Sequence, residues 1–433
     1  MIDLLIVADD LTGALDTGAQ FARYGRRTLV SWAGGGLPPA DADVWVLDTE
    51  TRALPPAEAR AAVAQAVAPF LPVLHIYKKV DSTLRGPIGA ELEALLALGV
   101  AEQALLAPAF PAQGRTVLGG ELRVHGQPLA QTPFAQPGRA TSLVGELIAA
   151  STRLAVDSMG LQQVRQGVQS LARAVDSMGL QQVRQGVQSL ARALAAQTEP
   201  VLVLDALTEA DLAVAAQAAA LAGRDRLLAG SAGLAAQLPA VWGWARPKSA
   251  AAPAAVTGPI LCVAATKHPA LAGQLLHLQQ QAQLEIVKDV LPGILPGEEP
   301  AAARAAAAVV EALAQGRDVA LTTLGAPLVA GGDRLVVALL GRIAAQALQQ
   351  ARPGALMLTG GDTAMAVCRT LGAEAIIVEG QVEAGVPLGR LAGGEADGLP
   401  IATKAGGFGD EGVLWRMACA LRGRAHEIPT GSS

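Results

Sequence analysis

The chain begins with an apolar run that stops abruptly at two acidic residues. Residues 4–8 read LLIVA, which is typical of a buried parallel strand, and Asp9 and Asp10 follow directly. A turn containing Thr12 and Gly13 then leads into an amphipathic segment that predicts a helix. Because ligands of open α/β sheets bind at the carboxyl ends of the strands, the two acids indicate a site for a polar small molecule. The alternative is that Asp9 and Asp10 only cap the turn or the helix.

The same alternation of strand and helix continues along the chain and predicts an α/β fold with parallel sheets and right-handed crossovers. Further strands are expected at 44–47, 73–77, 103–106, 201–204 and 227–229, and then at 260–264, 319–323, 356–358, 375–378 and 400–403. Those at 319–323, 356–358 and 375–378 are expected to lead into helices. The stretch 247–259, rich in Pro and Ala, is typical of a linker. We therefore predict two domains, 1–246 and 260–433, each with a mainly parallel sheet flanked by helices.

Composition excludes several classes of partner. The 433 residues carry a net charge of -5, which does not suit binding to nucleic acid or to anionic lipid. No apolar run is long enough to span a bilayer and no basic leader precedes the first strand, so we expect a cytoplasmic protein without a membrane partner. Cys262, Cys368 and Cys419 are far apart in apolar surroundings, which indicates reduced core residues. The sequence leaves a homo-oligomer open.

An exact tandem repeat interrupts the strand–helix alternation. Residues 155–173 and 174–192 both read AVDSMGLQQVRQGVQSLAR. Each copy predicts a helix with one apolar stripe, capped by Asp157 or Ser158 in the first copy. Along one straight helix the second stripe would be rotated by about 100° from the first. We therefore expect either two helical pieces with a break near 174–177 or one copy that extends into solvent.

Two glycine-rich turns in the second half indicate a phosphate site. They are Gly360-Gly361-Asp362-Thr363 and Gly406-Gly407-Phe408-Gly409-Asp410, each directly after a predicted strand. Such turns present backbone N–H groups and the positive end of a helix dipole. Neither is a Walker A motif, and no G-x-G-x-x-G fingerprint follows a strand. A plain turn is the alternative for each one, but their recurrence in one predicted sheet favours a nucleotide.

Charged residues at predicted strand ends of the first half form a different set. Acids there can accept hydrogen bonds from hydroxyl groups, and cations can bind a carboxylate or a transferring phosphoryl group. The acids are Asp9, Asp10 and Asp16, and the cations are Lys78, Lys79, Arg85 and Arg115. A small polyhydroxy acid suits this mixture. The alternatives are that at least one of the two lysines is solvated and that Arg85 pairs with Glu91 or Glu93. His75 and His125 are interpreted as structural, whereas His268 lies on a turn.

Several motifs in fixed order make the chain recognisable. They are ADDLTGALDTGAQFA from Ala8, KKVDSTLRGPIGAEL from Lys78, APAFPAQGRT from Ala107, GSAGLA from Gly230, TGGDTA from Thr359, GVPLGRLAGG from Gly385 and TKAGGFGD from Thr403. With these motifs the chain resembles the four-carbon acid sugar kinase family. The resemblance implies a sugar-binding N-terminal domain, a nucleotide-binding C-terminal domain and ATP-dependent phosphorylation of a tetronate at its C4 hydroxyl. D-threonate is the expected substrate, with D-erythronate and 3-oxo-tetronate as alternatives.

Two segments depart from the family pattern. Where the family usually has a serine-rich turn, this chain has Ala264-Ala265-Thr266-Lys267-His268-Pro269, in which Thr266 can supply a hydroxyl and Lys267 a charge. The tandem repeat is the other departure, and we interpret one copy as an insertion outside the catalytic machinery. The altered turn also leaves open an inactive sugar-acid-binding or effector-like relative. A dinucleotide-dependent dehydrogenase is a further alternative, although its fingerprint is missing.

With this resemblance, the reaction is expected to be in-line phosphoryl transfer in an interdomain cleft, with ATP and Mg²⁺ as cofactors. The expected catalytic bases are Asp81 and Asp9, with Asp410 as a third candidate. The residues expected to bind substrate are Asp10, Thr12, Asp16, Lys79, Ser82, Arg85 and Arg115. Those expected to bind the nucleotide are Ser231, Thr266, Gly360, Gly361, Asp362, Thr363, Gly406 and Gly407. No metal ligands are assigned.

Overall fold

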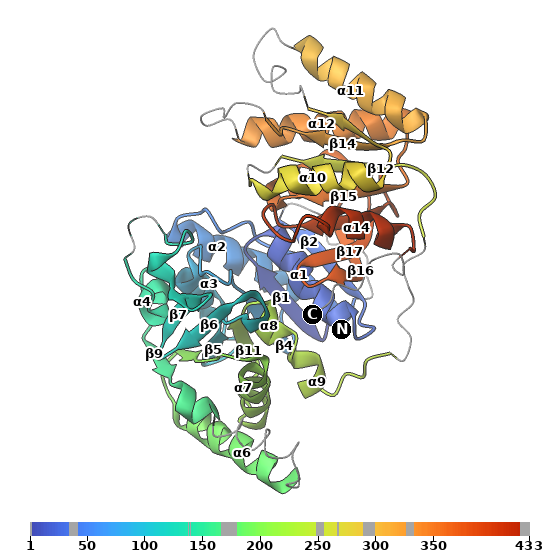
Figure 1. Cartoon of the computed structure of the whole chain (residues 1–433). Coiled ribbons are helices and arrows are strands. Elements are labelled where there is room, and N and C mark those ends of the chain that lie inside the picture. Colours follow the sequence, from blue (N-terminus) through green and yellow to red (C-terminus); the bar gives the residue numbers. More distant parts are fainter. Residues whose placement is uncertain are drawn as a thin grey trace. The chain divides into compact units, whose positions relative to one another are not determined.

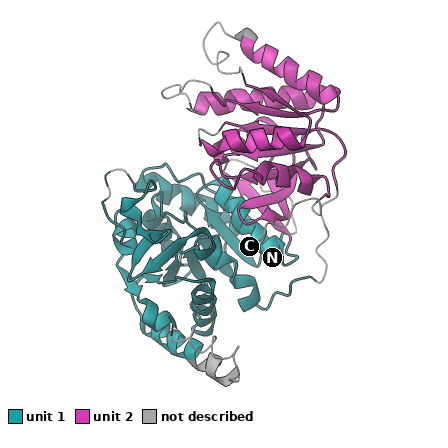
Figure 2. Cartoon of the chain, viewed as in Figure 1, with its two compact units in different colours: residues 1–26, 41–247 teal, residues 27–40, 248–433 magenta. Residues whose placement is uncertain are grey.

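The computed structural model divides into two compact units (Figure 2). Unit 1 comprises residues 1–26 and 41–247, and unit 2 comprises residues 27–40 and 248–433. The structure describes residues 2–33, 42–136, 138, 140–165, 180–247, 255–265, 268–288, 299–325 and 333–424. The predicted first domain ran without interruption to residue 246, whereas residues 27–40 group with unit 2. The physical reason is strand β2 (Thr28–Trp32), which pairs antiparallel with β16 (Ala375–Glu383) of that unit.

Unit 1 contains a parallel sheet, which confirms the predicted α/β class. Its strands, in spatial order, are β3 (Val44–Asp48), β1 (Leu4–Ala8), β4 (His75–Lys79), β11 (Leu227–Gly230), β5 (Ala104–Ala107), β10 (Val201–Leu204) and β9 (Val156–Met159). Every neighbouring pair among them is parallel. The described helices of this unit are α1 (Leu11–Ala22), α2 (Pro56–Val67), α3 (Ile88–Ala97), α4 (Val144–Ala149), α6 (Leu180–Ala196), α7 (Glu209–Leu221), α8 (Ala232–Ala235) and α9 (Leu238–Val241).

The central strands of unit 1 are covered on both faces. All five residues of β1 are fully buried, and α1 packs against β1, β3 and α8 (Figure 1). Two lysines of β4, Lys78 and Lys79, are 0% and 6% exposed. The prediction that at least one of them is solvated is therefore wrong, because β4 is a central strand, between β1 and β11, and the side chains on both of its faces are buried.

The first copy of the repeat begins as a strand. Its residues Val156–Met159 form β9, which pairs with β10 from Val201 to Leu204, so Asp157 and Ser158 are not helix caps. The helix that starts at Leu161 is capped by Asp205, whose carboxylate accepts a hydrogen bond of 3.0 Å from the Leu161 N–H. In the second copy, α6 packs against α7. The predicted break near 174–177 lies outside the described residues.

A small antiparallel sheet also belongs to unit 1 and was not predicted. It consists of β6 (Arg115–Leu118), β7 (Glu121–Val124) and β8 (Gln127–Pro128). The Asp205 carboxylate also accepts hydrogen bonds from the N–H groups of Gly119 and Gly120, in the turn between β6 and β7. One buried acid thus joins this turn to the first turn of the repeat helix.

Unit 2 contains a sheet of five parallel and three antiparallel strands. In spatial order they are β13 (Leu284–Val287), β14 (Asp318–Thr322), β12 (Ile260–Ala264), β15 (Ala355–Thr359), β18 (Pro400–Lys404), β17 (Val386–Ala392), β16 and β2. The strand predicted at 375–378 does not lead into a helix. As β16 it continues to Glu383 and turns back antiparallel into β17. The described helices are α10 (Ala270–Gln281), α11 (Glu299–Ala314), α12 (Asp333–Gln350), α13 (Gly361–Thr370) and α14 (Val413–Leu421).

Helices cover the parallel part of the unit 2 sheet. Alternate residues of β12 and β18, such as Cys262 and Ala402, share one apolar core with Leu271 and Leu275 of α10 and with Leu414 of α14. Helices α11 and α12 pack against each other (Figure 1), and α12 packs in turn against α13. No helix among the described residues is long and apolar enough to cross a membrane.

Candidate active site

The carboxyl ends of β1, β3 and β4 bring the charged turns of unit 1 together. In the sheet register Ala8 pairs with Asp48 and Val7 pairs with Lys78. The chain segments that follow these strands therefore leave the sheet side by side. Among them are Asp9 and Asp10 after β1, the turn up to Arg52 after β3, and Asp81 after β4.

Arg52 is the centre of this cluster. Its Nε and Nη2 donate to the two carboxylate oxygens of Asp9 at 2.8 and 2.9 Å. Its Nη1 and Nη2 donate to the two oxygens of Asp10 at 2.7 and 2.9 Å, and Nη2 lies 3.9 Å from an oxygen of Asp81. One guanidinium thus holds two carboxylates bidentately and approaches a third. We call Arg52, Asp9, Asp10 and Asp81 the Arg52 cluster.

Sequence reasoning missed Arg52, although a signal was present. The residue closes a polar turn that follows a predicted strand, which is the same position that singled out Asp9 and Asp10. The sequence did not show the spatial order of the strands. In the structure, β3 and β4 flank β1 on its two sides. Knowledge of that order would have placed Arg52 opposite the two acids.

Asp81 is held by its own turn as well as by Arg52. Arg85 donates to both of its oxygens, from Nε at 2.9 Å and from Nη2 at 2.7 Å, and the Thr83 N–H and hydroxyl donate to Oδ2. The alternative that Arg85 pairs with Glu91 or Glu93 is therefore wrong, because Arg85 lies four residues after Asp81 in a tight turn. The Arg85 side chain is still 55% exposed, so part of its guanidinium can reach a ligand.

The three carboxylates differ in proton affinity. Burial alone would raise the pKa of Asp9, but the positive charges of Arg52, Lys78 and Lys79 together outweigh it and lower that pKa. For Asp81, burial is likewise outweighed, chiefly by hydrogen bonds from Arg85, and its pKa lies well below the usual range. The pKa of Asp10 is raised, by burial and by the neighbouring Asp9 charge, in spite of Arg52. Asp10 is also the most accessible of the three, with a side chain 26% exposed against 1% for Asp9 and 11% for Asp81.

The backbone around the cluster is strained. Glu50 and Leu84 have positive φ angles of 52° and 57°, an uncommon conformation for residues with side chains. These two turns carry Arg52 and Arg85, and such strain is concentrated at functional sites. Gly86, at φ 98°, lies so close that a Cβ there would be 3.3 Å from Asp9 Oδ2 and 3.5 Å from the Arg52 Cα. A glycine is therefore required for the turn to approach the cluster.

The two buried lysines lie directly behind the cluster. Lys78 forms a fully buried ion pair of 3.1 Å with Glu91 of α3, whose other carboxylate oxygen accepts from the Thr51 hydroxyl. Lys79 donates to the Val80 carbonyl at 2.7 Å. Both ammonium groups help to lower the pKa of Asp9, so they contribute positive charge to the site.

The other residues expected to bind substrate lie in the turn after β4, in α1 and in β6. Thr12 is in the first turn of α1, Ser82 adjoins Asp81, and Asp16 lies one helical turn beyond Thr12. Arg115 donates to the Gln113 carbonyl and lies over the Phe134 ring, 5.4 Å from its centroid. Burial lowers the pKa of Arg115, with the Asp81 carboxylate opposing this effect, so the two charges interact.

Ser231, expected to bind the nucleotide, belongs to unit 1. Its hydroxyl donates to the Ala109 carbonyl at 2.6 Å and accepts from the Gly233 N–H at the start of α8. The residue is 1% exposed. These contacts give no support to a role in nucleotide binding.

In unit 2 the predicted nucleotide residues gather at the carboxyl ends of the central strands. Ala264, Thr359 and Lys404 are adjacent in register on β12, β15 and β18, and the Gly360 N–H donates to the Lys404 carbonyl. Gly360 has φ 97° and precedes α13, so the following N–H groups of that helix start are presented at the strand end. Gly361, Asp362 and Thr363 form the first turn of α13.

The turn after β18 meets the segment after β12. A Cβ on Gly407 would lie 2.5 Å from Cδ2 of His268, so the imidazole packs directly on Gly407. Asp410 forms an ion pair of 2.9 Å with Arg416 and is 70% exposed. Thr266 and Lys267 lie outside the described residues.

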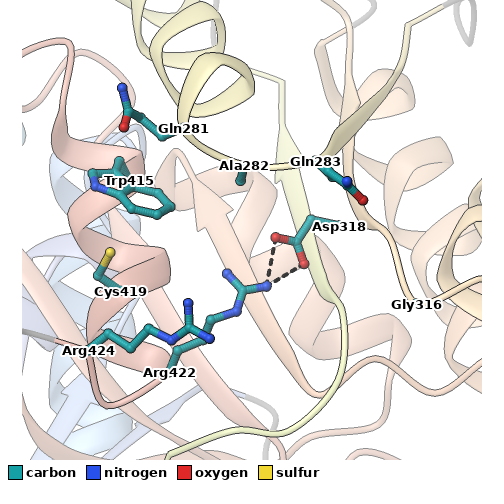
Figure 3. Close-up of a pocket in the computed structure, with 9 residues that line it drawn as sticks. All are labelled: Gln281, Ala282, Gln283, Gly316, Asp318, Trp415, Cys419, Arg422 and Arg424. Carbon is teal, nitrogen blue, oxygen red and sulfur yellow. Dashed lines mark hydrogen bonds and ion pairs between the residues drawn. The ribbon is translucent and has the colours of Figure 1, made fainter. Parts of the chain in front are cut away.

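Unit 2 also has a cavity of about 240 Å³ that involves none of the predicted site residues (Figure 3). It lies near the starts of β13 and β14, where Arg422 donates to both oxygens of Asp318 and Trp415 and Arg424 form part of the wall. The glycine turns are at the opposite ends of the parallel strands. Because ligands of such sheets bind at the carboxyl ends, this cavity is not the predicted nucleotide site.

Two α/β units, one with a charged side-chain cluster and one with glycine turns at its strand ends, define a protein that binds a polar small molecule and a phosphate compound. Comparisons agree with this class. A family model described as a sugar-binding N-terminal domain matches residues 4–238, and one described as a nucleotide-binding C-terminal domain matches residues 261–414. The chain belongs to the four-carbon acid sugar kinase family.

Relatives of known activity match over nearly the whole chain. A D-threonate kinase of Salmonella typhimurium is 34% identical, with 95% of this chain and 96% of that protein covered. One of Bordetella bronchiseptica is 36% identical, with 97% of each covered. Among solved structures, a Salmonella typhimurium LT2 protein has a TM-score of 0.76 and 25% identity, covering 96% of this chain and 99% of the other. A Haemophilus influenzae protein at 20% identity, with a TM-score of 0.72 and coverage of 98% and 99%, shares the fold.

Proposed function

We propose that the protein transfers the γ-phosphoryl group of ATP to the C4 hydroxyl of a four-carbon acid sugar, with D-threonate as the preferred substrate. D-erythronate and 3-oxo-tetronate are the alternatives. The observation that carries this proposal is the match to D-threonate kinases at 34–36% identity along nearly all of both chains. Relatives named as D-erythronate and 3-oxo-tetronate kinases match at 28–31%.

The Arg52 cluster supports the substrate half of the proposal. A tetronate has one carboxylate and several hydroxyl groups, so it needs both cations and hydrogen-bond acceptors. Arg85 and Arg115, whose charges act on Asp81, are suited to the carboxylate. Asp9 and Asp10 then orient hydroxyl groups, and Arg52 keeps the two acids at a fixed spacing.

A carboxylate must accept the proton of the attacking hydroxyl, and we assign this role to Asp10. A base works best when its pKa approaches the working pH. The pKa of Asp10 is raised, whereas the pKa values of Asp9 and Asp81 are lowered by their arginine partners. In this assignment Asp81 anchors Arg85. That Asp81 or Asp9 is the base, with Asp410 as a third candidate, stays a prediction.

The glycine turns support the nucleotide half. The start of α13 and the turn after β18 offer backbone N–H groups to phosphate oxygens. Mg²⁺ bound with the nucleotide would neutralise phosphate charge. The described residues contain no group of three or more His, Cys, Asp or Glu side chains that could hold a metal by themselves. That the active site lies between the two domains stays a prediction.

A coupled assay of ATP consumption with D-threonate, D-erythronate and 3-oxo-tetronate tests the proposal. We expect turnover with at least one of them and the highest kcat/KM with D-threonate. Thermal stabilisation by a tetronate without turnover would instead identify an inactive binding relative. Tight binding of NAD without binding of ATP would favour the dehydrogenase alternative.

A further inference from the structure

The turn after β18 is fixed from inside by two buried side chains. The Lys404 ammonium donates to the carbonyls of Ala405 and Gly406 at 2.9 and 3.0 Å. From α10, the side-chain amide of Gln274 donates to the carbonyls of Phe408 and Gly409 at 3.1 and 3.0 Å. Lys404 is 1% exposed and Gln274 is 0% exposed. Four carbonyls of one short turn are therefore directed into the protein.

This arrangement directs N–H groups away from the interior. In a planar trans peptide the C=O and the following N–H point in opposite directions. Inward carbonyls at Ala405, Gly406 and Phe408 thus imply outward amides at Gly406, Gly407 and Gly409. Those three amides have no acceptor among the residues that the structure describes. Outward amides of this kind can bind an anion.

Lys404 is also a cation without a counter-ion. The buried Lys78 of unit 1 has Glu91 at 3.1 Å, but no carboxylate of the described chain pairs with Lys404. An uncompensated buried charge is costly, and burial lowers the pKa of Lys404 to about 8. Two of its three ammonium donors reach turn carbonyls, and the third has no acceptor within the described residues. The buried positive charge of Lys404 lies beside the outward amides of the same turn, and this combination indicates an anionic ligand.

We propose that Lys404 and Gln274 are positioning residues for the phosphate chain of the nucleotide: they hold the turn carbonyls inward, so that the Gly406, Gly407 and Gly409 amides face a phosphate, and Lys404 supplies the balancing charge. This inference rests on the proposed use of ATP. It adds Lys404 and Gln274, which lie beneath the glycine turn and belong to no recognised phosphate-binding motif, to the proposed nucleotide site.

The test compares metal-free ADP with adenosine, which lacks phosphates, by titration calorimetry on the full-length protein. Lys404→Met should weaken ADP binding by about tenfold or more, as expected for loss of a charged hydrogen-bonding group. Adenosine and D-threonate binding should not change, which also shows that the variant is folded. Gln274→Leu removes no charge and should weaken ADP binding by roughly threefold to tenfold.

The pH dependence of ADP binding tests whether Lys404 contributes charge to the nucleotide site, which a merely structural role would not require. ADP affinity of the wild type should fall between about pH 7 and about pH 9.5, because the ammonium loses its proton across the pKa of about 8, while adenosine affinity stays constant. Lys404→Arg should bind ADP with little change over this range, and Gln274→Leu should keep the wild-type slope. Ionisable groups on the surrounding elements are Cys262 on β12, Asp362 on α13, Arg416 on α14, and His268 and Asp410 in adjoining turns.

The outcomes distinguish this inference from the proposed function. Wild-type ADP affinity in Lys404→Met, or a pH dependence that persists in Lys404→Arg, would overturn the inference and leave the kinase proposal intact. A wild-type protein that binds neither ADP nor ATP would overturn the proposed function, and this inference with it. A parallel loss of ADP and adenosine affinity in Lys404→Met would also overturn the inference, because it would mark a general disruption of the domain.

Discussion

At the carboxyl edge of the unit 1 sheet, side-chain charges are dense and matched to one another, whereas the described part of the same edge in unit 2 carries glycine amides and a lysine, Lys404, that has no acidic partner there. Arg52 contacts three carboxylates, and Lys78 has its own buried partner in Glu91. Lys404 donates only to carbonyls. In the first edge acids and cations pair with one another, whereas in the described part of the second edge no carboxylate pairs with Lys404.

The difference follows from what each edge is proposed to bind. A sugar acid presents hydroxyl groups in one stereochemical arrangement, and rigid side chains with fixed acceptors can discriminate between such arrangements. A phosphate chain is highly charged and lacks stereochemistry of that kind, so backbone amides and a cation are sufficient. Changes in unit 1 should therefore act on the tetronate, and changes in unit 2 should act on the nucleotide.

The largest effect is expected from Arg52→Met. Removing the guanidinium leaves Asp9, Asp10 and Asp81 as mutually repelling, poorly solvated acids, so the sugar-acid site should collapse. We expect kcat/KM for D-threonate to fall by on the order of 10⁴, with ADP affinity retained. Steady-state kinetics and calorimetry with both ligands measure this.

Arg60→Met is the matched control for Arg52→Met. Arg60 is an arginine of the same unit that pairs with Glu93 at 2.8 Å, but its side chain is 51% exposed. Exposed pairs contribute little, so activity should stay within about twofold of wild type. Equal losses in the two variants would contradict the central role of Arg52.

A smaller effect, chiefly on kcat, is expected from Asp10→Asn. The amide preserves the hydrogen bond to the Gly13 N–H that caps α1, but it cannot accept a proton. We expect kcat to fall by on the order of 10² to 10³, with ADP affinity unchanged.

Asp81→Asn should instead raise KM for D-threonate, because it releases Arg85. If Asp81→Asn abolishes turnover while Asp10→Asn retains it, Asp81 is the base and our assignment is wrong.

The sequence alone was sufficient for the class of fold and for much of the charged edge. Buried strands that stop at polar residues predicted the parallel sheets, and the positions of Asp9, Asp10 and Asp81 after those strands predicted where polar groups gather. The order of strands across the sheet was not predictable from periodicity, and Arg52 depended on that order. Lys79 was misjudged for a related reason, because a central strand buries both of its faces.

Other features could not be predicted because they depend on contacts between segments that are far apart in the sequence. The residues of β16 have the apolar pattern of a parallel strand, and only pairing with β17 and β2 makes that strand antiparallel. In the repeat, the sequence AVDSM forms β9 because β10 offers a free edge beside Val156 to Met159. Local propensity does not contain that information. The inward role of Lys404 was also invisible, because burial and the absence of a counter-ion are properties of the fold.

A moderate effect on the nucleotide alone is expected from Gly360→Ala. The φ angle of 97° disfavours any side chain, although a Cβ would meet nothing closer than Thr363 Oγ1 at 3.6 Å. Relief of that strain should move the start of α13, so we expect ADP affinity to fall by about tenfold and D-threonate affinity to stay constant. Gly316→Ala, at φ 74° with no atom within 4 Å of its Cβ, is the matched control. A similar loss of ADP affinity in that control would indicate general destabilisation.

The smallest effect is expected from deletion of residues 174–192, one copy of the repeat. In the parallel order of unit 1, β9 is the outermost strand and is separated from β4 by β11, β5 and β10, so the change lies outside the Arg52 cluster. Deleting either copy yields the same sequence, which retains the residues of β9 and the helical segment. Kinetic constants should stay within about twofold of wild type, and Tm should change by only a few degrees.

Packing explains why one copy should suffice. Val164 of the first copy and Val187, Leu190 and Ala191 of the second are buried. In the shortened chain, the equivalents of these four residues fall at i, i+4, i+7 and i+8 of a single helix, which is one continuous apolar stripe. The stripe would be available to pack on α7, as α6 does in the full chain. If instead the deletion variant fails to fold, or loses D-threonate turnover while it keeps ADP affinity, the second copy supports the charged edge of unit 1 and is not a neutral insertion.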